Sequence, residues 1–127
     1  MLERLLSEML VPMAIRVFGK SHAEVDRTLG KPRAVGAGHR FHEYSRAGGG
    51  YYIVFDRGRS IQVTITLRQP ASTAAQSLAK AGFQMSGRKP VSEGPLEVRW
   101  ENLMGVPVVV VKATGGKRWD TIELRRH

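Results

Sequence analysis

The sequence has no cysteine and no long hydrophobic run among its 127 residues. The lack of cysteine excludes disulfides, thiolate metal ligands and a lipid-modified cysteine. No stretch reaches the roughly 20 apolar residues that a membrane-spanning helix needs. The first twelve residues include Glu3, Glu8 and Pro12, which is not the pattern of a secretory signal. We therefore expect one domain, over residues 1–127, without a membrane span. We expect it in the cytoplasm; the alternative is a protein whose leader has been removed.

A complete nucleotide-binding signature is also missing, although one fragment resembles it. Gly19-Lys20-Ser21 matches the end of the phosphate-loop pattern G-x-x-x-x-G-K-[ST], but Ala14 stands where the first glycine is required. Ser21 and Glu24 instead have the spacing of a capping box, which satisfies free N–H groups at the start of a helix. The sequence therefore predicts a helix over residues 22–29.

The titratable residues form no recognisable catalytic or metal-binding pattern. His39 and His42 fall in a stretch, 39–46, that is typical of a strand, where residues three apart point to opposite faces. Asp56 and Asp120 lie beside predicted turns, where aspartate commonly accepts local hydrogen bonds. We predict no catalytic residue, no metal site and no cofactor. A small enzyme is an alternative, and it would need a pocket that gathers His39, His42 or Asp56.

Positive charge is the strongest bias in the composition. The chain has 20 Lys and Arg against 11 Asp and Glu, which gives a net charge of +9. Such an excess favours polyanions, including nucleic acids. The basic residues are scattered and interleaved with acidic ones, however, as in many soluble domains. Nucleic-acid binding is therefore the alternative to the function predicted below.

Leucine and methionine recur at helical spacing near the start of the chain, which predicts an amphipathic helix over residues 1–16. Their apolar stripe would pack on the chain's own core or, alternatively, against a second copy in a homodimer. The members of the stripe are Leu2, Leu5, Leu6, Met9 and Leu10.

The rest of the sequence shows one pattern twice, over residues 17–69 and 70–127. Each half begins with a helix, and a loop and three strands follow. This pattern predicts an α+β fold, in which two αβββ units form one antiparallel sheet with the helices packed on one face. The predicted segments are the helices 22–29 and 71–81, the strands 39–46, 51–55, 61–67, 96–101, 106–112 and 119–125, and a turn at 47–50.

Alternation of polar and apolar residues indicates which side chains face away from the helices. Adjacent Tyr51 and Tyr52 point to opposite faces, so one should be buried and the other exposed. We predict a non-catalytic module that binds a protein partner through the polar sheet face and loops. The predicted contact residues are Tyr52, Thr64, Thr66, Arg68, Arg99 and Arg125.

Residues 17–67 resemble the SmpA/OmlA (BamE) family. The shared features are a glycine and a capping serine before a helix, an L-G-x-P exit from it, an aromatic strand, a strand that ends in phenylalanine, a turn glycine and a last apolar strand. The residues that carry the resemblance are Gly19, Ser21, Val25, Leu29, Gly30, Pro32, Phe41, Tyr44, Phe55, Gly58, Ile61, Val63 and Ile65.

The tandem pattern is similar to the β-lactamase inhibitor proteins, in which two such units share one concave sheet. Both resemblances imply a protein that holds other proteins without catalysis. Neither supplies a specific partner. The outer-membrane family is anchored through a lipid-modified cysteine and the inhibitors contain disulfides, whereas this chain has no cysteine.

Overall fold

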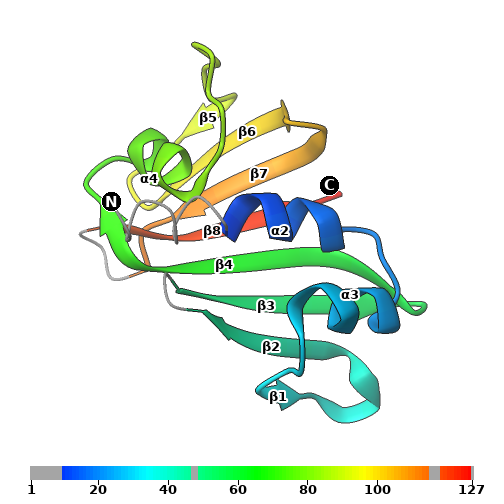
Figure 1. Cartoon of the computed structure of the whole chain (residues 1–127). Helices are drawn as coiled ribbons and strands as arrows, with labels where there is room; N and C mark the ends of the chain where they lie inside the picture. Colours follow the sequence, from blue (N-terminus) through cyan, green and yellow to red (C-terminus); the bar gives the residue numbers. More distant parts are fainter. Residues whose placement is uncertain (1–9, 47–48, 115–117, 127) are drawn as a thin grey trace.

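The computed structural model describes residues 10–46, 49–114 and 118–126. These residues form three α-helices, one 3-10 turn and eight strands in a single antiparallel sheet (Figure 1), which confirms the predicted α+β class. The helices are α2 (Leu10–Val17), α3 (His22–Leu29) and α4 (Ala74–Ala81), and the 3-10 turn is η1 (Ala37–His39). The strands are β1 (Ala34–Val35), β2 (Phe41–Arg46), β3 (Gly49–Asp56), β4 (Arg59–Ala71), β5 (Ser92–Glu93), β6 (Glu97–Leu103), β7 (Val106–Lys112) and β8 (Trp119–Arg125).

The sheet has the order β1-β2-β3-β4-β8-β7-β6-β5, so β4 and β8 pair in its middle. One helix, α3, precedes the first four strands and α4 precedes the last four, and the same order of elements therefore occurs on both sides of the β4–β8 pair. The outermost strands, β1 and β5, have two residues each and were not among the six predicted strands. Such short edges leave few backbone groups open to pairing with another chain.

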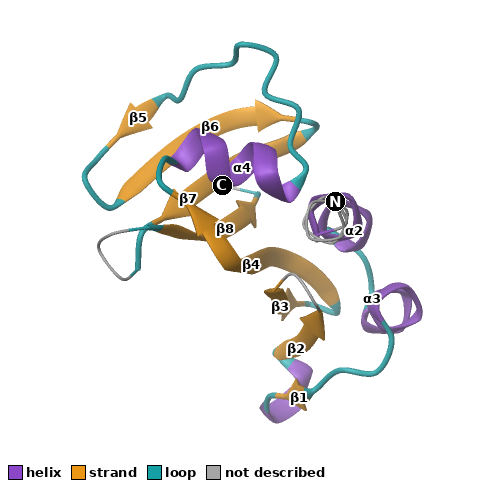
Figure 2. Cartoon of the chain, turned by 60° about the vertical axis from the view of Figure 1, so that its left-hand side comes forward, coloured by secondary structure: helices purple, strands orange, loops and turns teal. Residues whose placement is uncertain are grey.

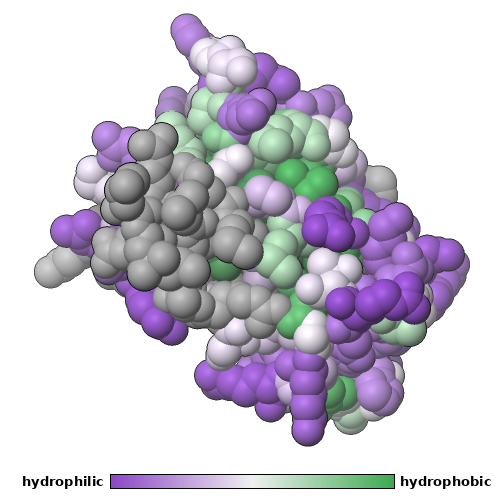
Figure 3. All heavy atoms as spheres, viewed as in Figure 1, coloured by the Kyte–Doolittle hydropathy of each residue, from purple (hydrophilic) through white to green (hydrophobic). Residues whose placement is uncertain are grey.

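All three helices cover the same face of the sheet (Figure 1 and Figure 2). The strand residues that point to this face form the core with the apolar sides of the helices, and Ile53, Val63 and Ile122 are fully buried there. Figure 3 views the molecule from the helix side, where hydrophobic side chains gather near the middle and hydrophilic ones surround them. The adjacent tyrosines point to opposite faces, as predicted; Tyr51 is buried in this core, whereas Tyr52 is half-buried on the other face and not fully exposed.

The described part of the first predicted helix, α2, packs on the chain's own sheet. Leu10 and Val17 are buried, and the Tyr51 hydroxyl donates a hydrogen bond of 2.7 Å to the Leu10 carbonyl. The Leu10 side chain therefore packs within its own chain. The other residues of the apolar stripe lie outside the described residues, and the homodimer stays a prediction.

The predicted capping box starts α3. The Ser21 hydroxyl accepts from the Glu24 N–H at 3.3 Å and donates to Glu24 Oε1 at 3.0 Å. The helix ends before Gly30, whose φ of 85° favours glycine. In α4 the cap is Thr73, and its hydroxyl accepts from the Gln76 N–H at 3.2 Å.

Several predicted boundaries were wrong. α4 begins at Ala74 and not at Ala71, because β4 continues through Pro70 to pair Ala71 with Trp119. The register of β4 shifts between Thr66 and Ala71, and such an irregularity can accommodate a proline in a strand.

The predicted strand 39–46 begins only at Phe41, because His39 belongs to the turn η1 and has a φ of 57°. The predicted turn at 47–50 is shorter at its end, since Gly49 and Gly50 already pair with β2 and β4. No helix among the described ranges is both long and apolar enough to cross a membrane.

Candidate functional site

The sheet face opposite the helices is polar, and no described helix lies over it (Figure 2). Strand register joins its side chains into rows; in one row Tyr52 lies between Glu43 and Thr64. We call this surface the open face. Its residues are Phe41, Glu43 and Ser45 in β2, Gly50, Tyr52 and Val54 in β3, Gln62, Thr64, Thr66 and Arg68 in β4, Thr121, Glu123 and Arg125 in β8, Val108, Val110 and Lys112 in β7, and Glu97, Arg99 and Glu101 in β6.

All six predicted contact residues lie on the open face. Tyr52, Thr66 and Arg68 line one hollow near the β2–β4 end of the sheet, and Thr64 pairs with Tyr52 in the neighbouring strand. The other two, Arg125 and Arg99, are on β8 and β6, on the far side of β4. The structure thus brings four of the six together and places two at a distance. Their role in binding stays a prediction.

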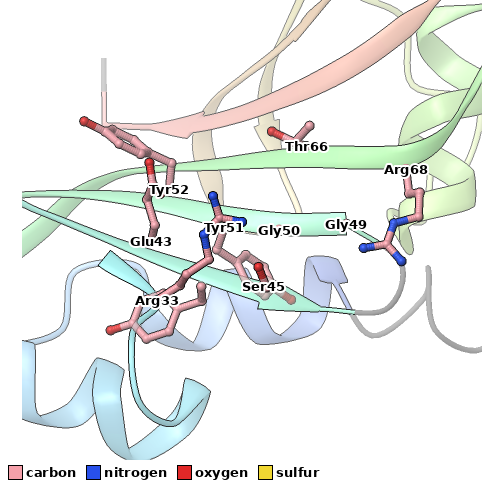
Figure 4. Close-up of a pocket in the computed structure, with 10 residues that line it drawn as sticks. Arg33, Glu43, Ser45, Gly49, Gly50, Tyr51, Tyr52, Thr66 and Arg68 are labelled. Carbon is pink, nitrogen blue, oxygen red and sulfur yellow. The ribbon is translucent and has the colours of Figure 1, made fainter. Parts of the chain in front are cut away.

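The hollow has a volume of about 470 Å³ and is lined by the two glycines that begin β3. A Cβ on Gly49 would stand 1.9 Å from the Thr66 carbonyl oxygen, so only glycine fits so close to β4. Gly50, between Ser45 and Thr66 in register, adds no side chain to the face. In Figure 4, Glu43 and Tyr52 lie toward one end of the hollow and Arg68 toward the other, with both glycines between them.

The walls of the hollow combine charge with an aromatic surface. Arg33 and Arg68 contribute two cations and Glu43 one carboxylate, and the Tyr52 ring stacks on Phe41 with centroids 4.9 Å apart. Guanidinium groups bind carboxylates and phosphates with two parallel hydrogen bonds, and tyrosine offers apolar contact together with a hydroxyl. The hollow therefore suits a side chain or chain segment that carries a negative group.

A buried ion cluster fixes the centre of the open face. Glu123 is only 7% exposed; its Oε2 lies 2.9 Å from Lys112 Nζ, and its Oε1 accepts from Arg125 Nε at 2.8 Å. Burial alone would raise the pKa of Glu123, but the Lys112 ammonium and the Arg125 guanidinium outweigh it and lower the pKa. The carboxylate is therefore ionised at neutral pH and holds two cations in place.

Two valines lie under these polar groups. Val108 and Val110 point away from the helices, yet they are 4% and 1% exposed. In register, Val110 stands between Glu123 and Arg99. Long charged side chains bury apolar surface along their stems, which accounts for the low exposure of the two valines. The open face is therefore packed, and its charged groups have restricted positions.

The charges of the open face balance, unlike those of the whole chain. Arg33, which precedes β1, adds one cation at the hollow, but the cationic and anionic side chains on the strands of the open face are equal in number. They are Arg68, Arg99, Lys112 and Arg125 against Glu43, Glu97, Glu101 and Glu123. The net charge of +9 is thus carried by other parts of the chain, and the open face does not have the cationic excess that a nucleic-acid platform needs.

Sequence reasoning missed three residues of this site. Glu43 and Lys112 occupy outward positions of predicted strands, so the alternation that identified Thr64 was also the signal for them. Arg33 precedes β1 and reaches the hollow because its N–H bonds the Glu43 carbonyl at 2.6 Å. No local pattern indicates that pairing.

The histidines are closer together than the sequence predicted. Because His39 lies in η1 and not in a strand, its Nδ1 comes within 3.1 Å of His42 Nε2, which corrects the prediction that the two imidazoles point apart. His22, the first residue of α3, joins them: its ring centroid is 5.5 Å from that of His39 and 5.2 Å from that of His42. We call His22, His39 and His42 the histidine cluster; it lies on the helix side, away from the open face.

Asp26 of α3 orients the buried member of the histidine cluster. His42 Nδ1 is 3.3 Å from Asp26 Oδ1 and 3.1 Å from the Tyr44 hydroxyl, which itself donates to Asp26. Burial lowers the pKa of His42, although the Asp26 carboxylate opposes the shift. His42 is therefore a neutral imidazole at pH 7, with Nδ1 held by α3 and Nε2 directed at His39.

The other chemical candidates have structural roles. The Gly19 and Lys20 N–H groups, which a phosphate loop would use, donate to the Ser60 hydroxyl at 2.7 and 3.2 Å. Asp120 accepts from the N–H and hydroxyl of Thr114, as expected beside a turn. Asp56 is exposed at a hairpin and does not join the histidine cluster.

Fold and site define a one-sheet α+β protein with helices on one face and a polar second face. Its structure is similar to that of a DUF4309 family protein, YjgB, from Bacillus subtilis, with a TM-score of 0.57, 14% sequence identity and 96% of both chains covered. At that identity the likeness supports the fold alone, and the BamE resemblance stays an expectation. No protein-family model and no curated protein matches the chain significantly.

Proposed function

We propose that the chain is a non-catalytic module that binds a protein partner on the open face. The observation that carries the proposal is the combination of a packed, charge-balanced face with a hollow of about 470 Å³ beside Tyr52. Protein interfaces are enriched in tyrosine and arginine and place anchors in such pockets. The Arg33 and Arg68 side chains favour a partner segment with an acidic group at this point.

Charge balance favours a protein over a nucleic acid as the ligand of the open face. A polyanion would meet four carboxylates there, among them Glu123, which cannot move away because Lys112 and Arg125 hold it. A protein surface with mixed charges can complement both signs.

Charge reversal tests the proposal. The double variant Arg68→Glu and Arg99→Glu changes the open face, and the control Arg16→Glu and Arg27→Glu makes the same charge change at exposed positions of α2 and α3. In affinity capture from cells of the source organism, the first variant should lose the proteins that the unchanged chain and the control retain. Both variants should melt within a few degrees of the unchanged chain. Equal capture by both variants would contradict the proposal.

Nucleic-acid binding is tested separately by fluorescence anisotropy of labelled DNA and RNA at several salt concentrations. Electrostatic binding to phosphates falls steeply as salt rises. The proposal expects no binding that depends on Arg68 and Arg99. If the chain binds nucleic acid tightly and salt-sensitively, and the double variant abolishes this binding, the ligand of the open face is a nucleic acid and the proposal is wrong.

A further inference from the structure

We propose that the histidine cluster is a binding site for Zn²⁺ or a chemically similar divalent ion. Imidazole is a common ligand for such ions, and three imidazoles with an open fourth position form a familiar zinc site. The inference is independent of the open face, because the cluster lies on the other side of the sheet between α3, η1 and β2.

The spacing of the rings matches that of ligands around one ion. Zinc–nitrogen bonds of about 2.05 Å place two tetrahedral ligand atoms about 3.3 Å apart and the ring centroids about 5.2 Å apart. His39 Nδ1 and His42 Nε2 are 3.1 Å apart, and the three centroid distances of the cluster are 5.2, 5.3 and 5.5 Å. Replacing the hydrogen bond between His39 and His42 by an ion therefore needs little movement.

Each histidine of the cluster has a nitrogen lone pair to offer. His42 Nδ1 faces the Asp26 carboxylate, an acceptor, so Nδ1 carries the hydrogen and Nε2 keeps the lone pair. His22 Nε2 lies 2.8 Å from the His39 carbonyl oxygen, also an acceptor, which leaves the lone pair of His22 on Nδ1. In this conformation His39 Nδ1 carries the hydrogen that bonds His42 Nε2. His39 is exposed, so exchange with solvent can move this hydrogen to its Nε2, and Nδ1 then has the lone pair.

Metal-bound histidines usually donate a hydrogen bond from the ring nitrogen that does not bind the metal, and the contact between His42 and Asp26 is of this kind. A carboxylate on the far ring nitrogen fixes the tautomer and direction of the imidazole and strengthens it as a ligand. The Tyr44 hydroxyl, which donates to the same carboxylate, holds Asp26 in turn.

A turn of the His22 ring and a change of tautomer at His39 separate this conformation from a complete site. Among the described ranges, no three ligating side chains already enclose one position. His22, whose ring stacks on Phe55 with centroids 3.9 Å apart, must turn so that Nδ1 faces the other two rings. This turn breaks its hydrogen bond to the His39 carbonyl. Three histidines would then hold the ion, and the fourth position would take water.

The test is a Zn²⁺ titration of metal-free full-length chain at pH 7.4, in competition with a coloured chelator. The ligand variants are His39→Asn, chosen because asparagine tolerates the positive φ of 57° at this position, and His22→Gln. The matched control is His127→Asn, which removes the fourth histidine of the chain. Circular dichroism and melting of the metal-free variants check that each one folds.

We expect His39→Asn and His22→Gln to weaken Zn²⁺ binding at least tenfold and His127→Asn to change it less than twofold. Long-range ¹H–¹⁵N spectra should show Zn²⁺ shifting Nε2 of His42 and Nδ1 of His22. Binding that is equal in all variants, or that is lost only in His127→Asn, would overturn the proposal. The proposal would also be overturned if Zn²⁺ did not shift the ¹⁵N signals of these histidine ring nitrogens.

Discussion

The buried ion pair of the open face gives the sharpest prediction about stability. Lys112→Met removes the 2.9 Å contact to a Glu123 carboxylate that is 9% exposed at its side chain. A hydrogen bond to a charged group contributes about 1.5–3 kcal/mol, so the free energy of unfolding should fall by roughly 2 kcal/mol. For a chain of this size, that loss lowers the melting temperature by roughly 5–10 °C.

The same face provides a matched control. Arg99 and Glu101 form a pair at 3.5 Å, with side chains 37% and 47% exposed. Such exposed pairs contribute less than about 1 kcal/mol, so Arg99→Met should change stability little. The Lys112–Glu123 pair is closer, its carboxylate is buried and Arg125 also contacts that carboxylate, so the comparison measures what the buried ion cluster adds over an exposed pair.

Urea unfolding at pH 7 of single and double variants measures the coupling within each pair. We expect a coupling energy of about 1–2 kcal/mol between Lys112→Met and Glu123→Gln. The coupling between Arg99→Met and Glu101→Gln should stay below about 0.5 kcal/mol. Equal coupling in the two pairs would refute the view that Glu123 is a buried, fixed carboxylate.

Three further predictions concern acid, the hollow and the helix connection. Because folding lowers the pKa of Glu123, its carboxylate stabilises the folded state above pH 4.5, the ordinary pKa of glutamate, and this stability is lost as the pH falls through the folded-state pKa. The urea midpoint should therefore fall less with acid in Glu123→Gln than in the unchanged chain. Thr66→Phe, opposite Gly50, should fill the hollow and reduce partner capture without lowering the melting temperature; a lower melting temperature would show that the ring does not fit there. Ser60→Ala removes one bond donated to the Val17 carbonyl and two accepted from N–H groups, and it should cost about 2–3 kcal/mol in urea unfolding. The exposed Ser72→Ala is its control and should cost less than about 0.5 kcal/mol.

The fold class and the open face could be predicted because they depend on local periodicity. Alternation along β4 places Thr64 and Thr66 opposite Val63 and Ile65 whatever the neighbouring strands are. The helix α3 was predictable for the same reason, since its capping box is contained in residues 21–24.

The hollow and the histidine cluster depend on contacts between distant residues. The hollow depends on Gly50, which adds no side chain opposite Thr66, 16 positions along the chain, and on Gly49, where a Cβ would meet the Thr66 carbonyl. The histidine cluster needs α3 to lie over β2 and His39 to adopt a positive φ, which reverses the direction that a strand would give it. No local sequence pattern indicates either contact. The sequence therefore predicted only a turn at residues 47–50 and predicted that the side chains of His39 and His42 point apart.

Site-specific photocrosslinking tests the central claim, that a protein partner binds the open face, most directly. A photoreactive phenylalanine derivative at the position of Tyr52 samples the hollow, and the same group at the position of Arg27 samples the exposed side of α3. After illumination in cells of the source organism, we expect the group at the Tyr52 position to form discrete protein adducts. The group at the Arg27 position should form none of the same adducts. The same adducts from both positions, or adducts to nucleic acid alone, would contradict the claim.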